Sequence, residues 1–295
     1  MKNFKDKVAV ITGSGSGMGE AMAWRFARAG MRIVIADIDL TAAVRVRDAL
    51  IAAGHVAIAQ RTDVADAASV AALADCAYSR FGSVDILCNN AGVVPSGRHR
   101  PVWEYPMEDW KWSFDVNTMG VAHGLHSFVP RMLAQKTEGH VVITASVAGL
   151  LSGSGSAVYS AAKHAAVRIG EALYASFEEM QAPIGVTVLC PGLVNTRIYE
   201  SERNRPQNLQ PDGGAAPETA ELQAIASSLY NSAISPETVA EQVFEAVQNK
   251  TLYALTTTNF DATIRERMEA ILERRAPHFD SLLEMSKRDV RPTAR

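Results

Sequence analysis

The sequence predicts an α/β protein with a three-layer, doubly wound fold around a seven-stranded parallel sheet. The first observation behind this prediction is that short apolar runs alternate with longer amphipathic ones along the 295 residues. The second is a hydrophobic content of 47%, which argues against intrinsic disorder and supports a sizeable core. The third is that no glycine-rich or proline-rich linker divides the chain. We therefore expect a single domain over residues 1–295.

The first expected strand is 8–12, a continuous apolar run that ends at glycines, as buried parallel strands do. Gly30 and Gly54 follow two amphipathic stretches, where a glycine often ends a helix. Ser235 and Pro236 begin another helix, because serine caps the first turn and proline fits its first position. The further expected strands are 32–37, 55–59, 84–88, 140–144, 185–190 and 252–255. The further expected helices are 17–29, 41–53, 66–81, 107–129 and 159–180.

Two segments depart from this alternation. Residues 195–235 contain three prolines and an Asp-Gly-Gly turn, and so long a connection in a compact fold is usually a functional lid or a flexible insert. We expect a substrate-loop insert there. Residues 256–295 are expected to form a C-terminal helical extension. Because residues 261–295 carry eight Lys/Arg and seven Asp/Glu, this end of the chain has mixed charge and is not a basic arm.

Charge and cysteine content exclude several classes of function. The 29 Lys+Arg and 32 Asp+Glu give a net charge of −3, without the basic surplus of a nucleic-acid-binding protein. No apolar run is long enough for a membrane-spanning helix, and the charged amino-terminal residues do not resemble a signal peptide. Three widely spaced cysteines fit reduced thiols, and no histidine has metal-like spacing. We expect a cytoplasmic protein without a metal, nucleic-acid or membrane partner.

A glycine-rich loop joins the strand at 8–12 to the helix that follows. Without Cβ atoms, its backbone can approach a pyrophosphate, whose charge the amino terminus of the helix stabilises. The glycine spacing is Gly-x3-Gly-x-Gly, which differs from the strict Gly-x-Gly-x-x-Gly fingerprint. A turn that merely collects glycines is the alternative. The residues expected to bind a dinucleotide here are Gly13, Ser16, Gly17, Met18 and Gly19.

Asp37 ends the second expected strand, 18 residues after Gly19, where an acidic residue is expected to contact the adenosine ribose. A carboxylate accepts hydrogen bonds from ribose hydroxyls and repels a 2′-phosphate. Ser16 stands where a basic side chain would help to hold that phosphate. Both features favour NAD over NADP, and NADP use is kept as the alternative.

Tyr159 and Lys163 are four residues apart at the start of an expected helix, so both project from one face. A phenol is a poor acid or base at neutral pH unless a nearby cation stabilises its anion, and the ammonium group can do so. Ser146 follows the expected strand 140–144. Because ligands of open α/β sheets bind beyond the carboxyl ends of the strands, these residues and the glycine loop are expected to converge.

Several motifs occur in order between about residues 5 and 255. They are Thr12-Gly13-x3-Gly17-x-Gly19, Asn89-Asn90-Ala91-Gly92, Asn117, Ser146, Tyr159-x3-Lys163 and Pro191-Gly192. Jointly they are very specific, and the chain resembles the short-chain dehydrogenase/reductase family. The resemblance implies a Rossmann fold. In many members the helices corresponding to 107–129 and 159–180 form subunit contacts, so a homo-oligomer (a dimer or a homotetramer) is expected. From the sequence alone, the apolar residues of these helices are equally core residues.

The resemblance also implies roles for individual residues. Tyr159 would be the general acid/base, and Ser146 would polarise the substrate carbonyl or steady the alkoxide. Lys163 would lower the pKa of Tyr159 and bind the nicotinamide ribose, while Asn117 would hold a water molecule in a proton relay. Besides the loop residues and Asp37, the implied cofactor contacts are Asp63, Val64, Asn90, Ala91, Gly92, Tyr159, Lys163, Pro191, Gly192, Val194 and Thr196.

The function expected from these features is hydride transfer between NAD(H) and a secondary alcohol or ketone. Segments 93–97, 147–152 and 198–229 should line the substrate pocket, and their mostly apolar residues favour an aromatic or steroid-like substrate. Residues 128–132 resemble the aryl-ether alcohol dehydrogenases of the family. Alternatives are an NADP-dependent carbonyl reductase, including the 3-oxoacyl type, and a non-catalytic, cofactor-sensing binding protein, which the four intact catalytic residues disfavour.

Overall fold

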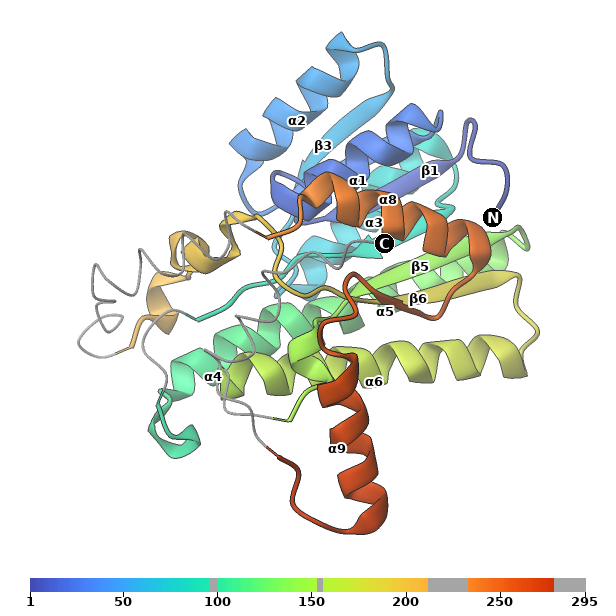
Figure 1. Ribbon diagram of the computed structural model, residues 1–295. Coiled ribbons are helices and arrows are strands. Elements are labelled where there is room, and N and C mark those ends of the chain that lie inside the picture. Colours follow the sequence, from blue (N-terminus) through green and yellow to red (C-terminus); the bar gives the residue numbers. More distant parts are fainter. Residues whose placement is uncertain (96–99, 153–155, 212–232, 279–295) are drawn as a thin grey trace.

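The computed structural model describes residues 1–95, 100–152, 156–211 and 233–278. Seven parallel strands form one sheet in the order β3-β2-β1-β4-β5-β6-β7 (Figure 1). The strands are β1 (Val8–Thr12), β2 (Arg32–Asp37), β3 (Ala57–Arg61), β4 (Ile86–Asn89), β5 (Gly139–Thr144), β6 (Ile184–Cys190) and β7 (Tyr253–Leu255). The expected α/β class and seven-stranded parallel sheet are therefore confirmed.

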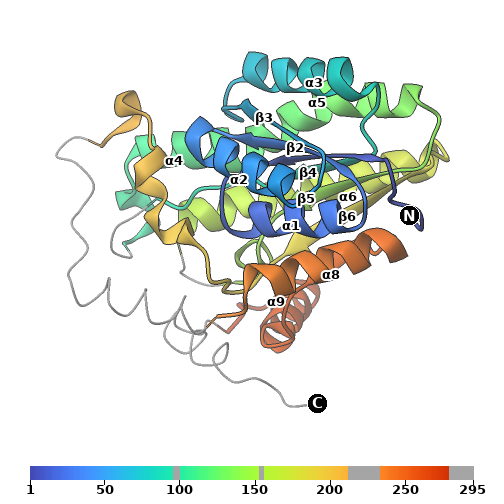
Figure 2. The same ribbon diagram turned by 90° about the horizontal axis from the view of Figure 1, so that it is seen from above.

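Helices cover both faces of the sheet, as Figure 2 shows with α3 and α5 on one side and α1 and α8 on the other. The helices are α1 (Gly17–Arg28), α2 (Leu40–Ala52), α3 (Ala67–Phe81), α4 (Met107–Phe114), α5 (Gly120–Ala134), α6 (Ala157–Glu179), α8 (Pro236–Asn249) and α9 (Asp261–Glu273). Side chains of β1 alternate between two hydrophobic cores. Val8 and Val10 join the core under α3, α5 and α6, whereas Ala9 and Ile11 join the core under α1, α2 and α8.

Two expected elements differ from the structure. The helix expected at 107–129 continues to Ala134 and is interrupted by a π turn at Asp115–Met119, between α4 and α5. A widened turn leaves no trace in apolar periodicity, which explains why it was not expected. The strand expected at 55–59 is β3, at Ala57–Arg61. It is an edge strand that is only partly buried, and its pairing with β2 continues through two polar residues, Gln60 and Arg61, which an apolar pattern does not reveal.

The order of the strands in the sheet reverses at β1, because β2 lies on one side of β1 and β4 lies on the other. In such sheets a crevice opens beyond the carboxyl ends of these strands. The segment after β6 lies over this edge and contains two short 3-10 helices, η4 (Arg197–Asn204) and η5 (Gln207–Leu209). Of the expected insert and extension, residues 212–232 and 279–295 lie outside the described residues.

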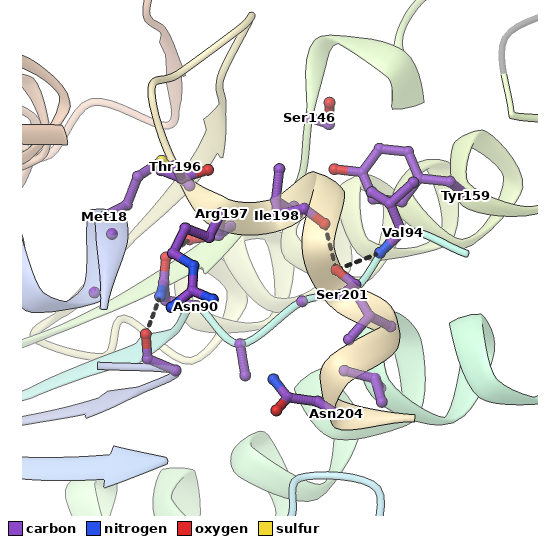
Figure 3. Close-up of a pocket in the computed structure, with 18 of the residues that line it drawn as sticks. Met18, Asn90, Val94, Ser146, Tyr159, Thr196, Arg197, Ile198, Ser201 and Asn204 are labelled. Atoms are coloured by element: carbon purple, nitrogen blue, oxygen red, sulfur yellow. Dashed lines mark hydrogen bonds between the residues drawn. The ribbon is translucent and has the colours of Figure 1, made fainter. Parts of the chain in front are cut away.

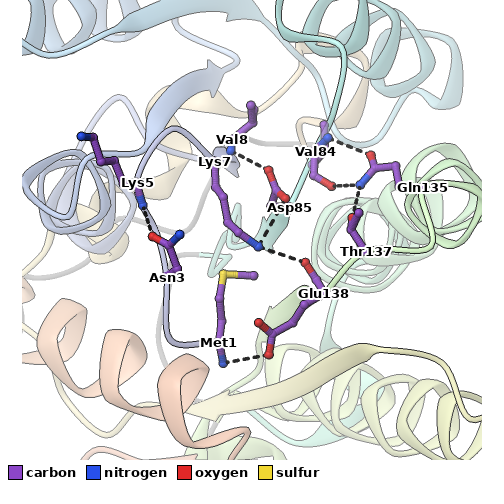
Figure 4. Close-up of polar contacts among 10 residues, drawn as sticks. All are labelled: Met1, Asn3, Lys5, Lys7, Val8, Val84, Asp85, Gln135, Thr137 and Glu138. Carbon is purple, nitrogen blue, oxygen red and sulfur yellow. Dashed lines mark hydrogen bonds and ion pairs between the residues drawn. The ribbon is translucent and has the colours of Figure 1, made fainter.

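Polar contacts tie the elements together at the opposite edge of the sheet (Figure 4). The carboxylate of Asp85, just before β4, accepts a hydrogen bond from the backbone N–H of Val8 at 2.8 Å and lies 3.7 Å from the ammonium of Lys7. The terminal amine of Met1 donates to the carbonyl of Val247 in α8 at 3.0 Å, and it pairs with Glu138 at 3.5 Å. Contacts between residues far apart in the sequence thus close this edge. Within the described part of the chain, no helix is long and apolar enough to cross a membrane.

Candidate active site

A cavity of about 570 Å³ opens at the carboxyl ends of the strands, bounded by the glycine loop, the ends of β2, β4, β5 and β6, and the segment after β6. All residues expected at the site, apart from Asn117, line it. They are Gly13, Ser16, Gly17, Met18, Gly19, Asp37, Asp63, Val64, Asn90, Ala91, Gly92, Ser146, Tyr159, Lys163, Pro191, Gly192, Val194 and Thr196. Residues from separate parts of the sequence therefore meet around a single cavity.

The glycine loop needs its glycines for two distinct reasons. Gly13 and Gly17 have φ angles of +64° and +56°, a conformation that other residues rarely adopt. At Gly19, a Cβ atom would lie 2.2 Å from the carbonyl oxygen of Gly13, so no side chain fits. The glycines therefore allow the loop to turn tightly and to pack closely on Ala91 and Asn90.

Helix α1 begins at this loop. Its N-cap residue, Ser16, makes no side-chain hydrogen bond to the first turn. The first N–H groups of a helix have no partner within the helix, and together with the helix dipole they form a site for an anion. Because Ser16, Gly17 and Met18 line the cavity, this amino terminus faces the space where a pyrophosphate would lie.

The carboxylate of Asp37 lies beside the glycine loop. One of its oxygens accepts a hydrogen bond from the N–H of Gly15 at 2.8 Å, and the other accepts from the N–H of Asp39 at 3.0 Å. Burial raises the pKa of Asp37 above its usual range, although both backbone donors oppose this shift. Each oxygen accepts one of these bonds and keeps a further lone pair, so the side chain is positioned to accept hydrogen bonds from a ribose diol.

Asn90 ties together three strand ends at the floor of the cavity. Its Nδ2 donates to the carbonyl of Thr12 at 3.0 Å, and its Oδ1 accepts from the hydroxyl of Thr144 at 3.2 Å. The hydroxyl of Thr12 in turn accepts from the N–H groups of Asn90 and Ala91 at 3.0 and 3.1 Å. Asn90 thus supports the site through the ends of β1, β4 and β5.

The other expected cofactor contacts lie on both sides of this floor. Val64 packs against Gly120 so closely that a Cβ there would lie 2.8 Å from Val64 Cγ2. After β6, the N–H of Gly192 donates to the hydroxyl of Thr256 at 3.1 Å. Thr196 packs on Gly17, where a Cβ would lie 3.1 Å from its methyl group. The segment after β6 and the glycine loop are therefore adjacent walls of the same cavity.

Ser146 and Tyr159 come from β5 and α6 and meet at the cavity. Ser146 follows β5 and caps a short 3-10 helix, η3 (Val147–Gly149), by accepting from the N–H of Ala148 at 3.1 Å. Tyr159 lies in the first turn of α6, which Ser156 caps. Both residues line the cavity, and Figure 3 draws the Tyr159 hydroxyl and Ser146 in the same part of it. The cavity wall therefore carries a hydroxyl group from each of these two elements.

Lys163 lies one turn further along α6, with 2% of its side chain exposed. Its ammonium donates to the carbonyl of Thr144 at 2.8 Å and lies 5.8 Å from the centre of the Tyr159 ring. Burial lowers the pKa of Lys163 to about 8, because the buried cation loses hydration. Such a group is still mostly protonated at neutral pH, so it can stabilise the anion of the neighbouring phenol.

Asn117 lies behind the cavity, within the π turn, and is fully buried. Its Oδ1 accepts from the N–H of Val93 at 3.1 Å, and its Nδ2 donates to the carbonyls of Val93 and Ser113, both at 2.9 Å. The amide group is therefore occupied in fixing the chain after β4. The role in holding a water molecule, which the family resemblance implies, stays a prediction.

Sequence reasoning missed several residues that line the cavity. Trp112 of α4 resembles any core aromatic of an amphipathic helix, and no sequence signal distinguishes it as a residue of the site. Phe260 precedes α9 in a stretch without a sequence signal. Ser201 accepts a hydrogen bond from the N–H of Val94 at 3.1 Å (Figure 3). Of the expected pocket segments, residues 96–97, within 93–97, and residues 212–229, within 198–229, lie outside the described residues.

Residues 7–207 match the short chain dehydrogenase family, and this range contains the glycine loop, Ser146, Tyr159 and Lys163. The chain belongs to the short-chain dehydrogenase/reductase family. It is thus an oxidoreductase of the class that acts on CH–OH groups. Among the described residues, no group of three or more His, Cys, Asp or Glu side chains could hold a metal ion.

Solved structures and curated proteins similar to the chain agree with this assignment. A short-chain dehydrogenase/reductase from Burkholderia phymatum, solved in complex with NAD, is 43% identical with a TM-score of 0.87, covering 96% of this chain and 99% of its own. A CLA biosynthesis dehydrogenase/reductase of Lactiplantibacillus plantarum is 34% identical over 94% of this chain and 97% of its own. The 1-deoxy-11-beta-hydroxypentalenate dehydrogenase of Streptomyces exfoliatus is 36% identical over 90% and 87%.

Proposed function

We propose that the protein is an NAD-dependent dehydrogenase that interconverts a hydrophobic secondary alcohol and its ketone. The observation that carries the proposal is the arrangement of one cavity. Asp37 lies at one end beside the glycine loop, and Tyr159, Ser146 and Lys163 lie together at another part of its wall. A dinucleotide extended between them would bring its nicotinamide to the paired hydroxyl groups.

The residues of the cavity fit this cofactor. The tight turn at Gly13 and Gly19 and the amino terminus of α1 suit a pyrophosphate, and Asp37 suits a ribose diol. Lys163 would hold the nicotinamide ribose. When bound, the nicotinamide supplies a carbon that accepts or releases a hydride.

The proton chemistry belongs to Tyr159. During alcohol oxidation, its oxygen would take the proton of the substrate hydroxyl, and during ketone reduction its O–H would return that proton. The Lys163 ammonium favours the tyrosinate that the first direction requires, and Ser146 donates a hydrogen bond to the substrate oxygen as charge develops on it.

Apolar side chains dominate the rest of the cavity, which favours a substrate with a large hydrophobic body. These side chains are Val93, Val94, Trp112, Leu151, Ile198, Leu209 and Phe260. The arginines of this part of the cavity already have acceptors: Arg197 pairs with Glu200 through Nε at 2.6 Å, and Arg203 donates to the carbonyls of Arg197 and Glu200 at 2.8 Å. An uncharged aromatic or polycyclic alcohol therefore suits this region better than a carboxylate.

NADP use by a carbonyl reductase is the second candidate, because Arg45 lines the cavity near Asp37. The guanidinium of Arg45, however, pairs with Glu20 at 2.6 Å and donates to the carbonyl of Gly15 at 2.9 Å. The Asp37 carboxylate would repel a 2′-phosphate at this position. NAD is therefore our proposal, supported by the similar protein from Burkholderia phymatum that was solved with NAD.

Initial rates with NAD⁺ and NADP⁺ test this proposal over a panel of benzylic, steroidal and aliphatic secondary alcohols. We expect turnover with apolar cyclic or aromatic alcohols, and kcat/KM at least about tenfold higher with NAD⁺ than with NADP⁺. A preference for NADP⁺ would refute the cofactor assignment. Absence of turnover with the whole panel, in both directions, would refute the substrate class.

A further inference from the structure

Residues 197–209, here called the covering segment, form one wall of the cavity. Ile198, Ser201, Pro206 and Leu209 of this segment all line it. Ser201 attaches the segment to the chain after β4 by accepting the hydrogen bond of Val94. A second attachment is made by a charged residue that the proposed chemistry does not use.

This residue is Arg205, whose side chain is only 1% exposed. Within the covering segment, its guanidinium pairs with Glu202 at 3.2 Å and its Nε donates to the carbonyl of Leu209 at 2.7 Å. Towards α4, it pairs with Asp109 at 2.6 Å and lies 4.9 Å from the centre of the Trp112 ring. Arg205 therefore folds the covering segment on itself and joins it to α4.

The partner carboxylate is equally enclosed, since the side chain of Asp109 is 4% exposed. Burial raises the pKa of Asp109 above its usual range, while the hydrogen bond and charge of Arg205 oppose the shift. A buried pair of this kind adds little net stability, because desolvation offsets the attraction between the charges. Arg205 holds the segment in one geometry through the hydrogen bond from its Nε to the carbonyl of Leu209, together with its ion pairs to Glu202 and Asp109.

The position of this pair connects it to the substrate. Trp112, whose ring lies beneath the guanidinium, lines the cavity. Pro206, the next residue after Arg205, and Leu209, whose carbonyl accepts a hydrogen bond from Arg205, line it as well. The cofactor part of the cavity, in contrast, is built on the strand ends, the glycine loop and residues 192–196, which precede the covering segment. A shift of the covering segment away from α4 would therefore open the apolar part of the cavity and leave most of the cofactor contacts in place.

We propose that Arg205 is a positioning residue for substrate binding: its ion pair with Asp109 holds the covering segment against α4, so that the segment completes the apolar wall beside Trp112. The proposal rests on the proposed function in that the molecule bound by this wall is the alcohol or ketone. Its kinetic consequence is a higher KM for the alcohol, with the binding of NADH and the proton chemistry of Tyr159 preserved.

The test compares wild type with Arg205→Lys, Arg205→Met and the double variant Asp109→Asn/Arg205→Met. Arg205→Met leaves a buried charge without its partner and can fail to fold, whereas the double variant leaves neither charge. We expect the KM for the best alcohol to rise at least about tenfold in the double variant, and less in Arg205→Lys, with the Kd for NADH changed less than about threefold. Recovery of the wild-type KM in the double variant would show that Arg205 only neutralises Asp109 and would overturn the proposal.

A control for the loss of an arginine–carboxylate pair lies on other helices. Arg131 of α5 pairs with Asp75 of α3 at 2.7 Å and lies over the ring of Tyr78 at 3.8 Å, but this pair is exposed to solvent. The double variant Asp75→Asn/Arg131→Met should leave the KM for the alcohol within about twofold of wild type. An equal rise of KM in this control would attribute the effect to the loss of a charge pair anywhere in the protein and would also overturn the proposal.

Hydrogen exchange tests the attachment without any turnover. Amides 197–210 should exchange at least about tenfold faster in the Arg205 double variant than in wild type, while those of β1 and α6 stay unchanged. If wild type turns over no alcohol, the proposed function fails, and this measurement still decides whether Arg205 holds the covering segment. Equal exchange of this segment in both proteins would refute that attachment.

Discussion

Acidification should destabilise the protein through His140, which is fully buried in β5. The Thr187 hydroxyl donates to the carbonyl of Thr251 at 2.7 Å, so the Nε2–H of His140 must donate to that hydroxyl, at 2.8 Å. The other ring nitrogen, Nδ1, has no hydrogen-bond partner among the described residues and faces Gly185, where a Cβ would lie 2.5 Å away. A proton added there would have no acceptor.

Burial lowers the pKa of His140 from 6.5 to about 3, and the positive charges of the terminal amine and of Lys250 add to this effect. Below the unfolded pKa, the unfolded chain therefore binds a proton that the folded chain does not. The free energy of unfolding must fall as the pH drops from about 6.5 towards about 3. At about pH 5 the linkage relation gives a loss of about 2 kcal/mol, and at about pH 7.5 almost none.

Urea unfolding at about pH 7.5 and about pH 5 measures this loss in wild type and in His140→Gln. The glutamine does not titrate, and its amide nitrogen matches the position of Nε2 and can still donate to Thr187, so the variant reports the contribution of all other groups. We expect wild type to lose about 2 kcal/mol more than the variant between the two pH values. Equal losses in the two proteins would refute this reasoning.

Two further predictions concern the cofactor. Asp37→Asn removes the charge that would repel a 2′-phosphate, while the amide oxygen of the new side chain can still accept a hydrogen bond from Gly15. The ratio of kcat/KM for NAD⁺ to kcat/KM for NADP⁺ should therefore fall at least about tenfold. An unchanged ratio would contradict the role given to Asp37. Gly19→Ala places a Cβ 2.2 Å from the Gly13 carbonyl, so NADH titration should show affinity weakened at least about tenfold. Gly54→Ala is the control, because Gly54 also has a positive φ, of +86°, but nothing lies within 4 Å of the added Cβ. The strained φ should lower the stability of this variant, while its affinity for NADH should stay unchanged.

Much of the fold could be predicted because local signals and tertiary structure agree along this chain. The apolar run of β1, the glycine after it and the residues that begin α1 all predict the same strand–loop–helix unit. The same agreement explains why residues as distant as Gly13 and Thr196 could be expected at one cavity, since parallel strands bring their carboxyl ends to the same edge.

The rest depends on contacts that sequence periodicity does not contain. The π turn around Asn117 is one extra residue in a continuous helix, and the occupation of its amide by Val93 follows only from the fold. Arg205 and Asp109 form an ion pair although they are 96 positions apart, and no sequence motif predicts it. Phe260 reaches the cavity because β7 returns the chain to the sheet, which composition cannot show.

The central claim, that Tyr159 transfers the proton in an NAD-linked alcohol oxidation, is tested most directly by Tyr159→Phe. The substitution removes one oxygen and leaves the ring beside Lys163, so NADH binding should survive. We expect kcat for the best alcohol with NAD⁺ to fall by about 10²–10⁴-fold, the range typical of a positioned acid or base, while the Kd for NADH changes less than about threefold. A variant with normal NADH binding and near-full kcat would contradict the account.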